Sequence, residues 1–324
     1  MKITIFATLI LSCFTAICFS QTTRITGTAG DAAGLSVSLN SYADLISFRE
    51  TILAQTEIGR DQTFSLELTH DKTLFAWLQI GIQKAEIILE PGKEYNISLS
   101  GLLGKEIRNQ EIAPFQIPPL SLEINHPWRF ELNGLVNDFN RFYDNFIAEN
   151  YSTIIRQRDK TTVEGFVREV YSRFPGIDNA WFNTMLTYQT GQLEIMARSR
   201  GREVIAGDYL KGKEILYDHF VYMEFFTQYF EKYLIASRMY DRNELEEILR
   251  SGQPYPQMMK LLSKDPVLED HRLRELVLLK GLFDLYVTPG FDRNNILNLL
   301  EYIQANGAFE EHRMIAGNLI SSLR

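Results

Sequence analysis

The spacing of apolar residues changes near Gly134, and this change constrains the fold more than any other feature of the chain. Before it, apolar and polar residues mostly alternate, as in the segment 35–39, which is typical of strands with one buried face. After it, apolar residues recur at steps of three and four, as in 139–147, which is typical of amphipathic helices. We therefore predict an α+β chain, with an N-terminal antiparallel β-sandwich at 21–134 and an all-α helical bundle domain at 135–324.

The strand pattern repeats along the first half of the chain. Strands are expected at 25–28, 35–39, 64–68, 74–80, 85–89 and 95–99. Two of these runs, 74–80 and 85–89, are densely apolar and indicate strands that are buried on both faces. We interpret the segment 40–53 as a crossing loop followed by a strand that carries Ile52.

The second half shows helical spacing with clear start and stop signals. Helices are expected at 139–147, 163–174, 178–196, 214–237 and 309–323, and Asp241, Asp265 and Asp292 have the positions of N-terminal caps. Pro254 and Pro256 are expected to break the chain between two helices, because proline removes a backbone donor.

The expected helix 214–237 is unusually aromatic. Charged residues interrupt it too often for a membrane span. The pattern favours a buried helix within the bundle. The alternative is an aromatic groove that binds a partner, for which the candidate residues are Phe225, Phe226, Tyr229 and Tyr233.

The first twenty residues have the pattern of a secretory signal peptide. Lys2 precedes an almost wholly apolar run, and small residues lead up to a cleavage point after Ser20. Both cysteines of the chain, Cys13 and Cys18, lie inside this segment, so the exported form is expected to lack thiol redox chemistry. The alternatives are an uncleaved anchor helix and a lipoprotein acylated at Cys18. We expect export to the periplasm or cell envelope, without membrane anchoring unless Cys18 is lipidated.

Charge and motifs exclude several classes of function. The formal net charge of −8 provides no basic face, so no nucleic-acid partner is expected. None of the five histidines pairs with another at zinc-site spacing, and phosphate-loop, dinucleotide and nucleophile-elbow motifs are missing. We therefore assign no catalytic, cofactor-binding or metal-binding residue from motifs, and we expect no cofactor. Distant residues can still converge in the fold, so a hydrolase whose site is assembled from scattered residues stays open.

Several short motifs together resemble one family. They are ITGT at 25–28, GRDQTFSL at 59–66, ILEPGKEY at 88–95 and FELNG at 130–134, and the segment 274–282 looks like the helical linker of the same family. The combination resembles the region that precedes the thioredoxin domain in TlpA/ResA-like envelope disulfide reductases. The resemblance implies a β-sandwich and a helical segment. The W-C-x-x-C active site of that family would lie after Arg324, so no catalytic residue is carried over.

The resemblance implies a non-catalytic accessory or partner-binding module of an exported thioredoxin-like, TlpA-type envelope protein. Its partner would be another protein or a thioredoxin domain, in cis or in trans. The alternative is a stand-alone periplasmic binding protein for a small apolar or glycan ligand. The sequence leaves enzymatic activity open and points against it for this chain, since thiol–disulfide exchange would need a thioredoxin domain after Arg324.

Overall fold

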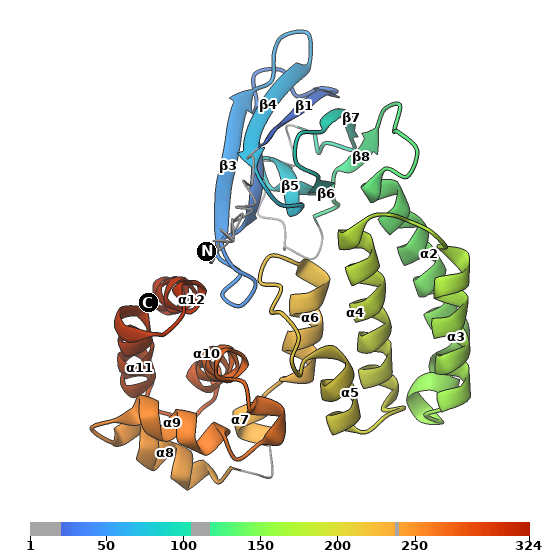
Figure 1. Ribbon diagram of the computed structural model, residues 1–324. Helices are drawn as coiled ribbons and strands as arrows, with labels where there is room; N and C mark the ends of the chain where they lie inside the picture. Colours follow the sequence, from blue (N-terminus) through green and yellow to red (C-terminus); the bar gives the residue numbers. More distant parts are fainter. Residues whose placement is uncertain (1–20, 105–116, 237–239) are drawn as a thin grey trace, which may run out of the picture.

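The computed structural model describes residues 21–104, 117–236 and 240–324 (Figure 1). The predicted signal peptide, with Cys13 and Cys18, lies outside the described residues. In the described part, a region of two packed β-sheets is followed by an all-helical region, as the change of apolar spacing near Gly134 predicts.

The N-terminal region consists of two four-stranded sheets packed face to face. Its strands are β1 (Gln21–Ala29), β2 (Ser36–Tyr42), β3 (Glu50–Glu57), β4 (Thr63–His70), β5 (Leu74–Ile80), β6 (Gln83–Leu89), β7 (Glu94–Ser100) and β8 (Ser121–Ile124). One sheet has the order β4-β1-β7-β8 and the other the order β3-β2-β5-β6. Inward-pointing residues such as Ile25, Leu39, Leu78 and Ile97 form a common core between the sheets, so the prediction of a β-sandwich is confirmed.

One strand pair differs from the predicted antiparallel arrangement. β1 runs parallel to β7, with Ile25 opposite Tyr95, while its other neighbour β4 is antiparallel. A short hairpin can pair only strands that follow one another in the sequence. Strands of the other sheet lie between β1 and β7 in the chain, so the local pattern does not predict that these two run parallel. Gly27 on β1 leaves room for side chains of both neighbouring strands, because a Cβ there would lie 2.7 Å from side-chain atoms of Phe64 on β4 and of Ile97 on β7.

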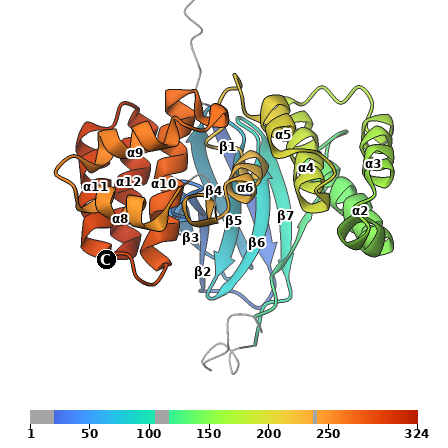
Figure 2. The ribbon, with the colours of Figure 1, turned by 90° about the horizontal axis from the view of Figure 1, so that it is seen from below.

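The helical region continues to the end of the described chain. Its elements are α2 (Leu132–Tyr151), the π-helix η2 (Ser152–Arg156), α3 (Lys160–Arg173), α4 (Ala180–Ala197), α5 (Arg202–Tyr209), α6 (Phe220–Tyr229), α7 (Tyr233–Ala236), α8 (Arg242–Arg250), α9 (Pro254–Leu262), the short 3-10 helix η3 (Pro266–Leu268), α10 (His271–Val287), α11 (Arg293–Asn306) and α12 (Glu310–Leu323). Figure 2 shows α2–α5 on one side of the sheets, α8–α12 on the other, and α6 between them.

The three predicted N-terminal caps are confirmed. The carboxylates of Asp241, Asp265 and Asp292 accept backbone N–H bonds at the starts of α8, η3 and α11, at 2.6, 2.8 and 2.8 Å. The prediction that Pro254 breaks the chain is wrong, because Pro254 begins α9. Proline is favoured in the first turn of a helix, where its missing N–H is not needed.

The single helix predicted at 214–237 is also wrong in extent. The chain from 211 to 219 is mainly loop, α6 begins after His219, and α6 and α7 are separated by Lys232, whose φ is 48°. This left-handed residue ends the helical path, although aromatic residues continue through it. The aromatic spacing alone does not show this interruption.

The outer face of the β3-β2-β5-β6 sheet packs against the helices. Phe75 on β5 stacks on Phe220 at the start of α6, with ring centroids 4.4 Å apart. The side chain of Asn133 in α2 forms hydrogen bonds with the backbone N–H and C=O groups of Ile88 on the edge strand β6. Its Oδ1 accepts from Ile88 N at 2.7 Å, and its Nδ2 donates to Ile88 O at 2.9 Å. The side chain thus occupies groups that another strand would otherwise use. None of the described helices has the length and apolar character that a membrane span needs.

Candidate functional site

The four residues of the predicted aromatic groove lie in the core of the helical region. The exposed fractions are 0% for Phe225 and Phe226, 8% for Tyr229 and 5% for Tyr233. Phe225 packs so closely against Gly191 of α4 that a Cβ there would lie 2.8 Å from the ring. Helices α6 and α7 therefore bury these side chains among their neighbours, and no cavity described below is lined by them.

Two cavities instead lie where the sandwich meets the helices. The first, which we call the junction cavity, has a volume of about 630 Å³ and lies between strands β5, β6 and β8 and helices α2, α4 and α6. Three aromatic side chains line it, Phe75, Trp181 and Phe220. Pockets of this size that combine apolar walls with several polar groups are typical of sites for small ligands.

Polar groups surround the apolar wall of the junction cavity. Asn137 and Asn140 contribute amides from one face of α2, Gln189 contributes another from α4, and Glu224 adds a carboxyl group from α6. Desolvation by the surrounding protein raises the pKa of Glu224 above its usual range, against the opposing effect of a hydrogen bond from Gln192. The cavity therefore offers aromatic faces beside groups that both donate and accept hydrogen bonds.

The second cavity, which we call the loop cavity, has a volume of about 780 Å³. The loop before α6 bounds it, together with the β4–β5 turn, the start of α4, the start of α10 and Glu311 of α12. Ion pairs cross it between Lys72 and Asp218 at 2.8 Å and between Arg272 and Glu311 at 2.6 Å. Both pairs are substantially exposed, so each contributes little stability.

Trp181 forms part of the wall of both cavities. The imidazole of His219 stacks on its indole at 4.5 Å, and His219 Nε2 donates to the Trp181 carbonyl at 3.0 Å. His219 Nδ1 accepts from Tyr222 N and so caps α6. Burial lowers the pKa of His219, which keeps the ring neutral and its Nδ1 free to accept. The indole Nε1 of Trp181 is buried without an acceptor among the described residues.

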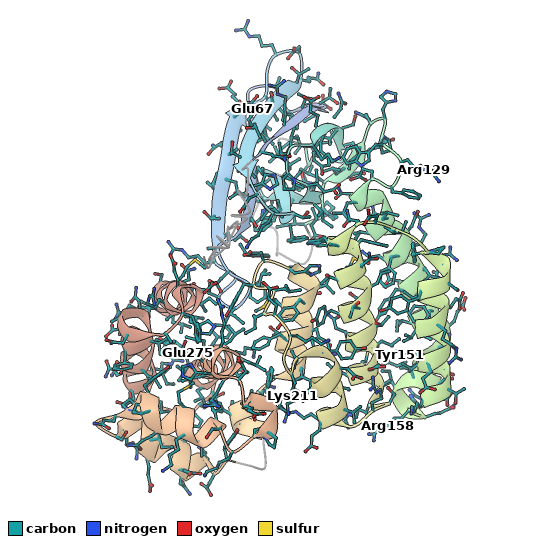
Figure 3. The ribbon with its side chains drawn as sticks, in the orientation of Figure 1. Glu67, Arg129, Tyr151, Arg158, Lys211 and Glu275 are labelled. Atoms are coloured by element: carbon teal, nitrogen blue, oxygen red, sulfur yellow. The ribbon has the colours of Figure 1, made fainter. Side chains whose placement is uncertain are left out.

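A chain of hydrogen bonds leads from the loop cavity into the helical core. Tyr217, which lines the cavity, is bonded through its hydroxyl to His312 Nε2 at 2.7 Å. His312 Nδ1 lies 2.6 Å from Glu275 Oε2, and the Tyr255 hydroxyl donates to Glu275 Oε1 at 2.5 Å. Figure 3 shows Glu275 on α10, inside the helical region. The side chains of Glu275 and His312 are completely buried.

Burial and neighbouring groups set the protonation of Tyr217 and Glu275 in this series of hydrogen bonds. Burial raises the pKa of Tyr217 to about 12, although the nearby Arg272 guanidinium opposes that rise. Burial also acts to raise the pKa of Glu275, but the hydrogen bonds from His312 and Tyr255 outweigh it and hold that pKa below the usual range. The resting arrangement is therefore a neutral phenol, an imidazole and an ionised carboxylate in sequence.

Sequence reasoning did not identify this chain of residues. Tyr217 lies 95 residues before His312, and Glu275 lies 37 residues before it, so no local motif connects them. Among the described residues, no cluster of three histidine, cysteine or acidic side chains has the arrangement of a metal site. No protein-family model and no curated protein sequence matches the chain.

Proposed function

We propose that this chain is a binding module of an exported, TlpA-type envelope protein, and that it holds a short glycan in the junction cavity. One observation carries the ligand class. The cavity brings the aromatic residues Phe75, Trp181 and Phe220 together with amide and carboxyl groups on α2, α4 and α6. Sugar rings present apolar C–H faces that pack on aromatic rings, and hydroxyl groups that need donors and acceptors at their edges.

The cavity also has a suitable size and rigid walls. Its volume of about 630 Å³ lies in the usual range for small-ligand sites, which is roughly 300–1,000 Å³. The Phe75–Phe220 stack joins the sheet to α6, and Asn133 fixes the start of α2 to β6. These contacts hold the two walls in place before a ligand arrives, which reduces the entropy cost of binding.

Titration with cellobiose and with N,N′-diacetylchitobiose tests the ligand class. We expect at least one of the two to change the fluorescence of Trp181, since that indole lines the cavity. Glu224→Gln should weaken that sugar's binding about tenfold, which corresponds to one charge-assisted hydrogen bond. Glu231→Gln is the matched control on an exposed acidic residue just after α6 and should bind like the unaltered chain.

Calorimetric titrations with both sugars decide the outcome. Equal weakening by Glu224→Gln and Glu231→Gln would remove the junction cavity as the site. The lack of any heat or fluorescence response to both sugars at millimolar concentration would remove the glycan class.

The accessory role in a thioredoxin-like protein is supported by the resemblance of the sequence motifs and by the two-part architecture. A sandwich followed by helices is the arrangement that the resemblance implies before a thioredoxin domain. In this role the chain carries no redox centre of its own. Purified residues 21–324 should therefore reduce insulin disulfides no faster than buffer containing dithiothreitol, and clear turnover would contradict the accessory role.

A further inference from the structure

The loop cavity contains an arrangement that ligand binding in the junction cavity does not use. We propose that the loop cavity is a hydrolytic site for small carboxylic esters, in which Tyr217 is the nucleophile, His312 accepts its proton and Glu275 orients His312. The inference is independent of the glycan site, because the Tyr217 hydroxyl and its partners lie outside the junction cavity.

The geometry is that of a nucleophile, a base and an orienting carboxylate. The Tyr217 hydroxyl lies 2.7 Å from His312 Nε2, and His312 Nδ1 lies 2.6 Å from Glu275 Oε2. An ionised Glu275 accepts the Nδ1 proton, which leaves the Nε2 lone pair directed at the Tyr217 hydroxyl. The same order of groups activates weak oxygen nucleophiles in unrelated folds.

The cost of burying this pair favours a function beyond stability. Glu275 and His312 have completely buried side chains, and apolar residues of similar volume often give equal or greater stability at such positions. At the inner end of this series of hydrogen bonds, the Tyr255 hydroxyl donates to Glu275. The outer end reaches the cavity through Tyr217. A buried carboxylate and imidazole whose hydrogen bonds end on a cavity wall are candidates for a functional site.

One further group supports charge that develops during the reaction. Arg272 Nε donates to the Tyr217 hydroxyl oxygen at 3.0 Å, so the guanidinium stabilises negative charge on that oxygen.

The reaction balances with water as the second substrate. The Tyr217 oxygen attacks the ester carbonyl carbon as its proton passes to His312 Nε2, and the tetrahedral intermediate expels the alcohol, which takes that proton. Water then attacks the acyl-tyrosine and gives a proton to His312, and the C–O bond to Tyr217 breaks. The phenolate recovers the proton from His312, and the carboxylic acid leaves.

Tyr255 provides a matched control within the same network. It bonds the same carboxylate as His312 does, but it does not line the loop cavity and has no contact with His312 in the described hydrogen bonds. A reagent that merely acylates hydrogen-bonded tyrosines will modify both residues. A reagent that depends on the relay will modify Tyr217 alone.

The test uses p-nitrophenyl acetate on the purified chain, residues 21–324. We expect a burst of p-nitrophenol and acetylation of Tyr217, located by peptide mass spectrometry, at least about 100-fold faster than at Tyr255. Tyr217→Phe should abolish the burst, while Tyr255→Phe should retain it. Near-ultraviolet circular dichroism checks that both variants keep the fold. Acetylation of both tyrosines at similar rates, or an unchanged burst in Tyr217→Phe, would overturn the proposal.

Glu275→Gln tests the orienting role through saturation kinetics. It should lower the maximal acetylation rate about 100-fold and leave the half-saturating ester concentration unchanged, because the ester contacts Tyr217 and not Glu275. A purely structural role predicts a different result, in which the remaining folded protein reacts at the unaltered rate. That second result would overturn the relay.

Discussion

Asn318 on α12 donates a hydrogen bond of 2.8 Å from Nδ2 to the buried carboxylate of Asp44, in the loop between β2 and β3. The same carboxylate accepts the backbone N–H groups of Ile46 and Ser47 and so shapes the loop. Leu45 and Ile46 then reach the core of the helical region. A loop of the sandwich therefore contributes apolar residues to the core of the helical region.

Removing the donor should weaken this connection. Asn318→Ala is expected to lower the free energy of unfolding by about 1–3 kcal/mol, because Asp44 stays buried with one fewer hydrogen bond. Asn306→Ala, at an exposed asparagine near the end of α11, should change it by less than about 0.5 kcal/mol. Urea unfolding followed by circular dichroism compares the two, and equal losses would show that Asp44 does not need Asn318.

A second prediction concerns the edge of the sandwich. Asn133→Asp keeps the shape of the side chain but removes the N–H group that donates to Ile88 O, and it places a carboxylate near Glu131. We expect a loss of about 1–3 kcal/mol in the free energy of unfolding. Asn137→Asp, one turn later and exposed, should cost less than about 0.5 kcal/mol. Thermal unfolding measures both, and a neutral Asn133→Asp would contradict the role of this side chain.

Acid should weaken the cap of α6. The pKa of His219 in the fold lies below its ordinary value of 6.5, so the unfolded chain binds the proton more readily than the folded chain does. The stability that the neutral ring contributes is complete above pH 6.5 and is lost as the pH falls through the lower folded value. His219→Asn does not titrate. The stability advantage of the unaltered chain over this variant should therefore shrink between pH 7.5 and 5, and a constant difference would refute this assignment.

Helix α10 should not tolerate a side chain at Gly281. A Cβ there would lie 2.5 Å from Leu234 Cδ1 of α7, so Gly281→Ala should cost about 1–3 kcal/mol through overpacking. A Cβ at Gly165 in α3 would meet only the end of the Arg168 side chain, at 4.0 Å, so Gly165→Ala should stabilise the helix by up to about 1 kcal/mol. Leu234→Ala removes the side chain that a Cβ at position 281 would meet. Gly281→Ala should therefore cost less in a Leu234→Ala background than in the unaltered chain. Denaturant midpoints measure these effects, and additive losses would rule out the direct contact.

The sequence predicted the elements better than their contacts. The runs 74–80 and 85–89 correspond to β5 and β6 because local apolar density suffices to define buried strands. The prediction of one helix at 214–237 is wrong, since the start of α6 depends on a side-chain cap at His219 and the interruption depends on a left-handed residue at Lys232. Both are set by surrounding structure and leave no periodic signal.

The candidate sites depend on contacts between distant segments. Tyr217, Glu275 and His312 come from a loop and two helices, and each has an ordinary local context. The junction cavity combines two sheets with three helices, so its aromatic residues show no common spacing in the sequence. What the sequence did allow was the expectation that a site, if present, would be assembled from scattered residues.

The bond between Asp44 and Asn318 spans 274 positions of the chain. During synthesis, which proceeds from the N-terminus, the β2–β3 loop emerges long before its partner helix exists. Until then Asp44 lacks this partner, and the loop that carries Leu45 and Ile46 is not held to the helical region through Asn318. Synthesis of α12 is therefore the step that allows this contact between the two regions to close.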